Sequence, residues 1–426
     1  MTLPEAQTAL GEARAALYGR GAQLAGLCGL AFLTIGSYEL ARPAAESLFL
    51  GAYGQEGLPW VWLCVACAAL VVVGVYNRLA SRLPILTMLV GAAATSVVLL
   101  TVLLTLELAA VPWAPFALYV FKDLYVVVLV EAFWSMANLH FHTATARWSY
   151  GLFCAAGSLG AIVGGLVVGP LAARVGTAST LWAVVGLLLI IGVAATGFGR
   201  DLGVAPPATN VAATLPSTVR LVRRSAYVGL MILLVTCTQL SITLIDYVFN
   251  GTVAAAYPVV DERTRVIGII YSGTAFVALV LQLATGVVLK KVGVPRTLLA
   301  LPLLLFVSVL AFVVTPAFAL VAAAKIASKS FDYSLFRAAK EMLYIPLGYR
   351  EKTEGKTVVD VLTYRVTKGL VSVLLLALAA LSLSGFASWL TLVAVVGWMG
   401  LAVVIGRRYR RLTAGAASGV VVVPEV

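Results

Sequence analysis

Residues 84–107 read PILTMLVGAAATSVVLLTVLLTLE, and their only charged side chain is Glu107 at the end. A helix of about 20 predominantly apolar residues crosses the hydrocarbon core of a bilayer. Similar stretches recur along the 426-residue chain, which is 62% hydrophobic and 11% charged. Globular proteins are about 45–50% apolar and about 25% charged. The sequence therefore predicts an all-α polytopic membrane protein, and it excludes a soluble globule, a disordered chain and a small disulfide scaffold.

Division of the length by the size of a span plus a short loop gives about 12 membrane-spanning helices. We expect them at residues 22–41, 58–77, 84–107, 114–138, 148–170, 178–198, 227–249, 266–289, 297–316, 318–336, 358–381 and 386–406. The predicted domains are an N-terminal tail (1–21), a six-helix bundle (22–198), a central linker (199–226), a second six-helix bundle (227–406) and a C-terminal tail (407–426).

The distribution of Lys and Arg predicts the orientation, because cytoplasmic loops are enriched in these residues. With the N-terminus inside, 21 of the 30 basic residues fall in inner segments, four fall in outer segments and five fall within spans. Both terminal tails and the central linker are therefore expected on the cytoplasmic side of a bacterial inner membrane. The net charge of +12 is spread over many loops, so it indicates topology and no nucleic-acid partner.

The two halves resemble each other in where their charges fall. A basic turn with Arg78 and Arg82 follows the second span, and Lys290 and Lys291 follow the eighth. Two six-span halves joined by an inner linker are typical of the major facilitator architecture, in which substrate binds near the midplane between halves. We expect the inner side to be closed by contacts between Arg78, Arg82 and residues 337–356.

Charged residues within spans are costly, by at least about 2.5–3.5 kcal/mol each on insertion scales, and are usually functional. Three spans contain them: Lys122, Asp123 and Glu131 in the fourth; Lys325, Lys329 and Asp332 in the tenth; Asp360, Arg365 and Lys368 in the eleventh. Glu39 and Asp246 lie nearer the outer ends of the first and seventh spans.

The balance of these charges favours an anionic solute. Five cations (Lys122, Lys325, Lys329, Arg365 and Lys368) face three deep anions (Asp123, Glu131 and Asp332). Ammonium and guanidinium groups bind phosphate and carboxylate well. We assign coupling or gating roles to Glu39, Asp123, Glu131, Asp246, Asp332 and Asp360, together with Arg78 and Arg82. Two alternatives stay open: structural salt bridges among these groups, or a coupling proton carried by Glu131 or Asp332.

Other chemistry is sparse in the sequence. Cys64 and Cys67 have the spacing of half a zinc site, but they lie in an apolar span without a second ligand pair. No phosphate-binding P-loop motif is present, so ATP hydrolysis is not predicted. We expect no metal, no cofactor and no enzymatic activity, and the predicted partners are a small anionic solute and the lipid bilayer, with the chain as a monomer.

Several segments resemble the ATP/ADP translocases, the major-facilitator-like nucleotide carriers of plastids and intracellular bacteria. The segments are FDYSLF (331–336), KEMLYIPL (340–347), YELARPAAE (38–46), FWSMAN (133–138) and GSLG (157–160). The resemblance implies twelve spans and alternating access with basic cavity residues. Carried over by position, it makes Arg42, Arg365 and Lys368 candidate anion contacts, and it adds Asn138 as a candidate substrate-binding residue.

The sequence also departs from the translocase pattern. Ala45 stands where the ATP/ADP exchangers have a lysine in the first-span motif, and Asp332 replaces another lysine. The loss of two basic positions favours a divergent relative that moves another nucleotide or anionic metabolite. A proton-coupled symporter or exporter of an unrelated solute is the first alternative hypothesis, and a non-transporting membrane scaffold or sensor is the second.

Overall fold

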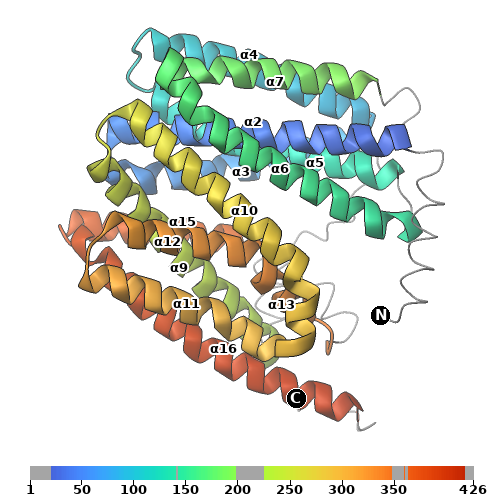
Figure 1. Ribbon diagram of the computed structural model, residues 1–426, viewed down its shortest axis with the longest axis vertical. Coiled ribbons are helices and arrows are strands. Elements are labelled where there is room, and N and C mark those ends of the chain that lie inside the picture. The colour runs from blue at the N-terminus through green and yellow to red at the C-terminus, as the bar shows by residue number, and fades with distance from the viewer. Residues whose placement is uncertain (1–20, 141–142, 198–224, 348–358, 360–362, 418–426) are drawn as a thin grey trace. The chain divides into compact units, whose positions relative to one another are not determined.

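The computed structural model describes residues 21–140, 143–197, 225–347, 359 and 363–417. Every regular element within these ranges is helical, which confirms the predicted all-α class (Figure 1). The N-terminal elements are α2 (Gly21–Tyr53), η1 (Gln55–Gly57), α3 (Leu58–Ala80), α4 (Ile85–Leu108), α5 (Ala114–His140), α6 (Thr143–Val175) and α7 (Thr177–Thr196). They are followed by α9 (Ala226–Ala256), α10 (Val260–Val292), α11 (Val294–Val314), α12 (Phe318–Phe331), η2 (Asp332–Phe336), α13 (Arg337–Met342), α15 (Thr363–Ala380), η4 (Ser384–Phe386) and α16 (Ala387–Ala417).

Nine helices in the described part of the chain are long and apolar enough to cross a membrane. The three other expected spans coincide with α5, α12 and α15, each of which contains charged residues of the predicted cavity. The chain is thus a multi-pass membrane protein.

The tenth predicted span is not one continuous α-helix. α12 ends at Phe331 and continues as a π-helical turn over Asp332–Phe336 before α13 begins. π-Turns inside helices are rare and are frequently found at functional sites. The turn directly follows the helix that contains Lys325 and Lys329, and it lies in the segment that resembles the translocases.

The described chain divides into two compact units. Unit 1 comprises Met1–Ala52, Cys67–Ala208 and Tyr257–Phe276, and unit 2 comprises Tyr53–Ala66, Thr209–Ala256 and Val277–Val426. Unit 1, which is built mostly from the N-terminal half of the sequence, also contains Tyr257–Phe276 of the C-terminal half. Unit 2, which is built mostly from the C-terminal half, also contains Tyr53–Ala66 of the N-terminal half. The six-helix halves 22–198 and 227–406 stay a prediction, and residues 199–224 of the expected linker lie outside the described residues.

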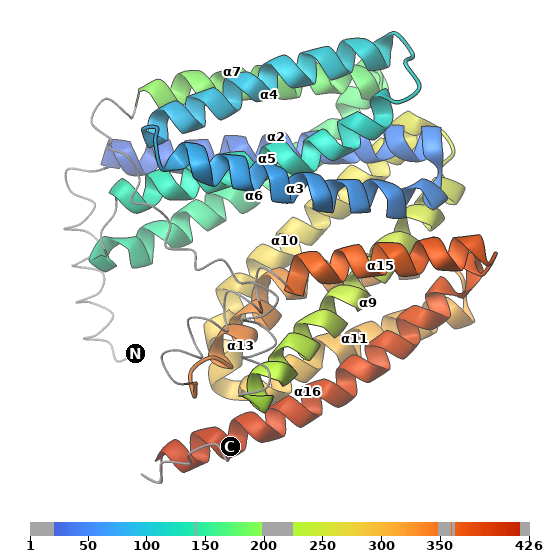
Figure 2. The ribbon, with the colours of Figure 1, turned by 180° about the vertical axis from the view of Figure 1, so that it is seen from behind.

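Each unit has its own apolar core. In unit 1, α4 packs along α7 (Figure 2). Leu104 of α4 and Leu188 of α7 are fully buried. In unit 2, α16 packs along both α9 and α11. Its Trp398 is fully buried with its ring edge against Phe336 at a centroid distance of 5.3 Å. The π-turn is thereby fixed to the core of unit 2.

Glycines bring α6 close to two helices within unit 1. A Cβ atom added at Gly160 would overlap the Phe32 carbonyl of α2, and one at Gly164 would overlap the Gly36 carbonyl. The next residue, Gly165, meets the Gly268 carbonyl of α10 in the same manner. Small residues let membrane helices approach closely, because lipid tails offer no hydrophobic driving force between helices.

Substitution of Gly160 by Ala should therefore destabilise the protein. The added methyl group must push α6 away from α2, and overpacking of this kind costs about 1–3 kcal/mol. Gly151→Ala is the matched control, because a Cβ there meets nothing within 4 Å. We expect thermal unfolding in detergent to show a lower Tm for Gly160→Ala alone, and equal Tm values for both variants would contradict the predicted contact.

Candidate functional site

A charged group in unit 1 begins on one face of α2. Glu39, Arg42 and Glu46 are spaced three and four residues apart, so they share a helix face. Arg42 Nη1 lies 3.6 Å from Glu39 Oε1, and Arg42 Nε lies 3.2 Å from Glu46 Oε1. Two carboxylates of its own helix therefore hold the Arg42 guanidinium.

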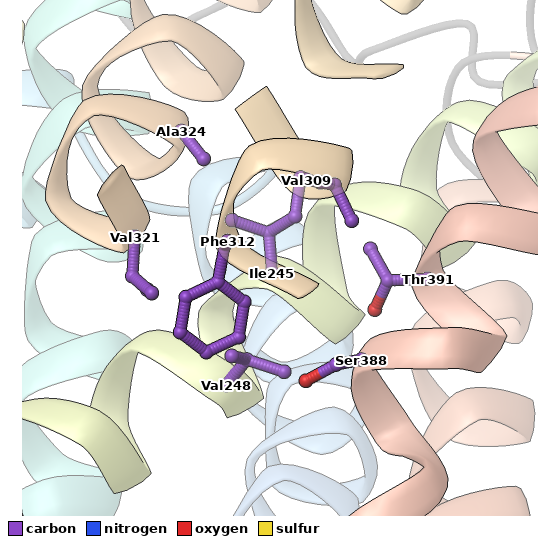
Figure 3. A pocket seen from close by; sticks show the side chains of 8 residues that line it. All are labelled: Ile245, Val248, Val309, Phe312, Val321, Ala324, Ser388 and Thr391. Carbon is purple, nitrogen blue, oxygen red and sulfur yellow. The ribbon is translucent and has the colours of Figure 1, made fainter. Parts of the chain in front are cut away.

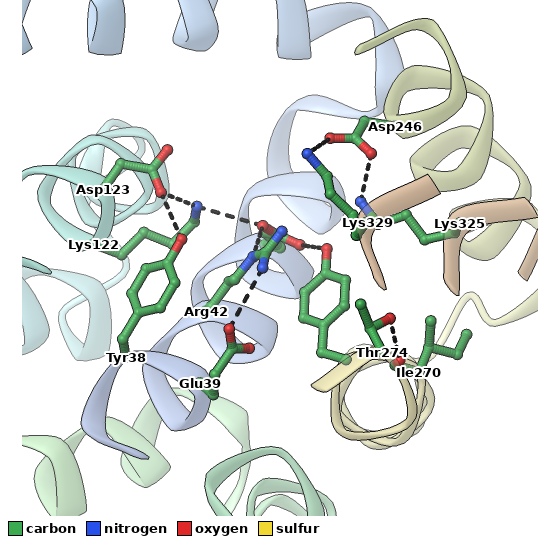
Figure 4. A network of polar contacts seen from close by, with 12 residues as sticks. Tyr38, Glu39, Arg42, Lys122, Asp123, Asp246, Ile270, Thr274, Lys325 and Lys329 are labelled. Carbon is green, nitrogen blue, oxygen red and sulfur yellow. Dashed lines mark hydrogen bonds and ion pairs between the residues drawn. The ribbon is translucent and has the colours of Figure 1, made fainter. Parts of the chain in front are cut away.

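Helix α5 contributes a second cation to this group (Figure 4). Lys122 Nζ lies 3.4 Å from Glu46 Oε1 and 2.9 Å from Asp123 Oδ1, and only 2% of Lys122 is exposed. Tyr38 of α2 donates a hydrogen bond to the same Asp123 oxygen at 3.3 Å. The ammonium also lies 3.9 Å from the centroid of the Tyr119 ring, which is cation–π distance. These contacts join α2 to α5 through Lys122.

The segment Tyr257–Phe276 of α10 completes the group within unit 1. Tyr271 donates a hydrogen bond to Glu46 Oε2 at 2.5 Å, and its ring lies 3.9 Å from Cζ of Arg42. Arg263, which is 2% exposed, donates to the Ser47 carbonyl at 2.6 Å. The carboxylate of Glu46 thus contacts Arg42 of α2, Lys122 of α5 and Tyr271 of α10.

Arg263 contacts a backbone carbonyl, and the ion-paired side chains of this group by themselves carry a net negative formal charge. Arg42 and Lys122 carry two positive charges, and Glu39, Glu46 and Asp123 carry three negative ones. Both cations are already neutralised by carboxylates of the protein. An anionic solute would therefore have to compete with these carboxylates for Arg42 or Lys122, so unit 1 by itself offers little excess attraction.

Unit 2 contains a smaller and positively charged group. Lys325 and Lys329 are one helical turn apart on α12 and both reach Asp246 of α9. Lys325 Nζ lies 2.7 Å from Asp246 Oδ1, and Lys329 Nζ lies 3.3 Å from Oδ2 (Figure 4). Lys325 is 1% exposed and lies 5.2 Å from the Phe249 ring centroid. Two ammonium groups converge on one carboxylate, which leaves a formal charge of +1.

Two further candidate residues lie on α15 of unit 2. The Lys368 ammonium lies 6.0 Å from the centroid of the Trp62 ring, and Trp62 packs edge-on against Tyr247 of α9. The side chain of Arg365 and the whole of Asp360 lie outside the described residues, so their roles stay predictions. Asp332 is the first residue of the π-turn and is partly buried.

The remaining candidates lie apart from these two groups. Glu131 is exposed on α5, and Asn138 is exposed where it accepts a hydrogen bond from Tyr150. Arg78 and Arg82 are exposed at the turn between α3 and α4. Their expected contact with residues 337–356 stays a prediction, because residues 348–356 lie outside the described part of the chain.

No group of His, Cys, Asp or Glu among the described residues has an arrangement that could hold a metal ion. A small pocket in the described part of unit 2 is lined by residues that include Ile245, Val309, Phe312, Ser388 and Thr391 (Figure 3). Its cavity volume of about 20 Å³ is too small for a metabolite. The Thr391 hydroxyl donates to the Ala387 carbonyl of its own helix, so this pocket is best described as a packing defect.

Comparison with known proteins relates this chain to a family of nucleotide carriers. The TLC ATP/ADP transporter family model matches residues 207–323 and 313–409. An ADP,ATP carrier protein 3 of Rickettsia typhi is 22% identical over 307 residues, which is 61% of each chain. The chain is a divergent relative of the ATP/ADP translocases. An ADP,ATP carrier protein 1 of Chlamydia muridarum is 27% identical over 60% of this chain and 57% of its own, so this translocase relative spans about three fifths of these carriers.

Solved structures show the fold of this translocase relative. A mutant of the nucleoside transporter NupG superposes with a TM-score of 0.67 at 12% identity, over 91% of this chain and 99% of its own. A bacterial homologue of the iron transporter ferroportin, in an inward-facing state, gives 0.65 at 14% identity over 96% and 99% of the chains. The predicted major facilitator-like fold is confirmed.

Sequence reasoning missed three members of the unit 1 group. Glu46 enters the sequence analysis only as the last residue of the segment 38–46, and no site role is predicted for it. Its position seven residues after Glu39 places both on the same helix face and could have indicated one. Tyr271 and Arg263 carry no signal in the sequence that links them to α2. Their contacts depend on how α10 packs in unit 1, which helix periodicity does not specify.

Glu46→Gln should destabilise the protein more than any other single change in this group. Removal of the charge leaves Arg42 and Lys122 without their shared carboxylate, and loss of one partner of a buried ion pair costs about 3–5 kcal/mol. Glu39→Gln should cost less because its contact with Arg42 is longer. Thermal unfolding in detergent measures the order, with exposed Glu131→Gln as the control. A Tm of Glu46→Gln equal to that of the control would contradict the role given to Glu46.

Proposed function

We propose that the chain is a secondary transporter that moves a nucleotide-like, phosphorylated or carboxylated anion across the bacterial inner membrane by alternating access. In this proposal both termini are cytoplasmic, as the distribution of Lys and Arg indicates. The protein acts as a carrier and not as an enzyme. Its two six-span halves, 22–198 and 227–406, are the parts that move against each other.

The observation that carries the proposal is the convergence of Lys325 and Lys329 on Asp246. A buried ammonium group is retained in an apolar span only when its charge is compensated. Asp246 is one carboxylate that both ammonium groups contact, so an incoming anion can take over part of these contacts. A phosphate or carboxylate that reaches this pair can replace the Asp246 contacts with charge-assisted hydrogen bonds of its own.

In this proposal Lys325 and Lys329 exchange Asp246 for the solute. Such an exchange suits transport better than lysines that have no carboxylate partner in the unloaded carrier. When the solute leaves, Asp246 again neutralises the lysines, so the unloaded carrier does not hold two uncompensated charges. Binding of the solute then gains only the difference between two sets of similar contacts. Weak net binding of this kind permits release on the opposite side.

The family relationship supports a nucleotide-like substrate. The relatives are named ADP,ATP carrier proteins, and the matched family model is that of an ATP/ADP transporter. Ala45 and Asp332 stand where the exchangers have lysines, so this chain has fewer positive charges for a polyphosphate. We therefore propose a solute with fewer negative charges than ATP, such as a nucleoside monophosphate or a sugar phosphate.

Counterflow in proteoliposomes tests the substrate class. Vesicles loaded with AMP, ADP, ATP, glucose 6-phosphate or adenosine are offered the same labelled compound outside. We expect uptake with at least one phosphorylated solute and none with adenosine, because the lysines select for charge. Absence of counterflow with every anion, or faster uptake of adenosine than of AMP, would contradict the proposal.

Removal of the lysine charges should abolish this uptake. Lys325→Gln and Lys329→Gln each remove a positive charge that faces the solute, and we expect at least a tenfold loss of uptake, which corresponds to about 1.4 kcal/mol. Lys290→Gln is the matched control, since it removes an exposed charge from α10 of the same protein. Normal uptake by both α12 variants would exclude these lysines from the substrate path.

The proton-coupled alternative is distinguished by the same vesicles. It requires uptake of an unrelated small solute driven by a pH gradient, with loss of the gradient effect in Glu131→Gln or Asp332→Asn. Glu131 is exposed and is separate from both charged groups, which favours the anion proposal. A scaffold or sensor would catalyse no counterflow at all.

A further inference from the structure

An apolar crevice of unit 1 is lined by residues of α3, α4 and α5. Its volume is about 510 Å³, within the range of about 300–1,000 Å³ found for sites that bind small organic molecules. The wall includes Val75 and Leu79 of α3, Gly91 and Leu99 of α4, and Leu124 of α5. Few of the lining side chains are polar, so the crevice suits a hydrocarbon chain.

The crevice ends beside two arginines. Val75, Arg78 and Leu79 share a face of α3, and Val75 and Leu79 belong to the crevice wall. Arg82 lies in the following turn, where its N–H donates to the Leu79 carbonyl at 2.9 Å, and it directly precedes the lining residue Leu83. The apolar groove is therefore continuous with a basic end.

The charges at this end are available to a ligand. Arg78 and Arg82 are exposed, and neither has an ion-pair partner among the described residues. Arg78 and Arg82 are four residues apart in the sequence. A single guanidinium group can donate two parallel hydrogen bonds to a phosphate, so two arginines here suit a phosphate ligand.

We propose that this crevice binds an anionic glycerophospholipid, with one acyl chain between α3, α4 and α5 and its phosphate against Arg78 and Arg82. The surrounding medium already consists of acyl chains, so burial of a chain gives no preference by itself. Selectivity has to come from the headgroup, and each Arg near the membrane surface contributes to binding of anionic lipids.

The bound lipid would lie against the helix that carries Lys122. Tyr125 of α5 lines the crevice, stacks on Phe121 and reaches the Ser37 hydroxyl of α2 at 3.5 Å. Ser37 precedes Tyr38, which holds Asp123. A lipid chain in the crevice therefore supports the wall behind the unit 1 charged group, and we expect it to raise the thermal stability of the whole protein.

Native mass spectrometry of the full chain in neutral detergent tests the proposal with phosphatidylglycerol and phosphatidylcholine of identical acyl chains. We expect about tenfold preference for phosphatidylglycerol, and loss of that preference in Arg78→Gln/Arg82→Gln. The control Lys290→Gln/Lys291→Gln removes two exposed charges from α10 and should leave it unchanged. Equal binding of both lipids by the wild type, or an equal effect of both double variants, would overturn the proposal.

The groove itself is tested by filling it. A Cβ at Gly91 meets nothing within 4 Å, so Gly91→Phe places its ring in the crevice without a backbone clash, and we expect it to abolish the bound lipid. Gly74→Phe is the control, because Gly74 is equally open on α3 but does not line the crevice. Retention of lipid by Gly91→Phe would contradict the assigned groove.

A photoactivatable phosphatidylglycerol provides a measurement that needs no variant. With a diazirine near the end of its acyl chain, it should label residues of α3, α4 and α5 that line the crevice in the wild-type protein. Equal labelling of all exposed helix faces would show lipid contact without a site and would overturn the proposal, as would labelling confined to another part of the chain.

Discussion

The ion pairs between helices are the interaction on which the rest of this structure depends. A charge within an apolar span is stable only when another group compensates it. Lys122 of α5 is held by Glu46 of α2, and Lys325 of α12 is held by Asp246 of α9. Each ion pair specifies how two helices pack against each other, because the hydrophobic effect does not favour one helix neighbour over another within a membrane.

The close glycine contacts act together with these pairs. Because lipid and leucine are equally apolar, helix position in a membrane is specified by close packing and by polar contacts. The glycines of α6 set its distance to α2 and α10, and the same α2 and α10 supply Glu46 and Tyr271 to the charged group. The packing of α6 therefore also determines the geometry around Arg42.

Much of this organisation could be predicted from the sequence. The all-α class, the spans and the charged residues follow from hydropathy, because each intramembrane charge is conspicuous against an apolar background. The family relationship follows from the segments near residues 331–347. The pairing of the charges could not be predicted, since a cation on α5 has acidic residues of several helices within reach, and only the packing decides between them.

Asp246 and Glu46 show this limit most clearly. The sequence places Asp246 near the outer end of its span, where the free-energy cost of a charge is smaller. It therefore gives no indication that Asp246 pairs with Lys325. The sequence gives equally little indication that Glu46 contacts both Arg42 and Lys122. The two lysines of α12, by contrast, share the single carboxylate of Asp246, and this difference between the units depends on three-dimensional partners.

The central claim is that Lys325 and Lys329 form the anion-binding site. Isothermal titration of the purified protein with AMP and adenosine measures this directly, in wild type and in Lys325→Gln/Lys329→Gln. The account predicts that AMP binds more tightly than adenosine to the wild type, and that the double substitution removes this difference while leaving the affinity for adenosine unchanged. An undiminished affinity for AMP in the double variant would contradict it.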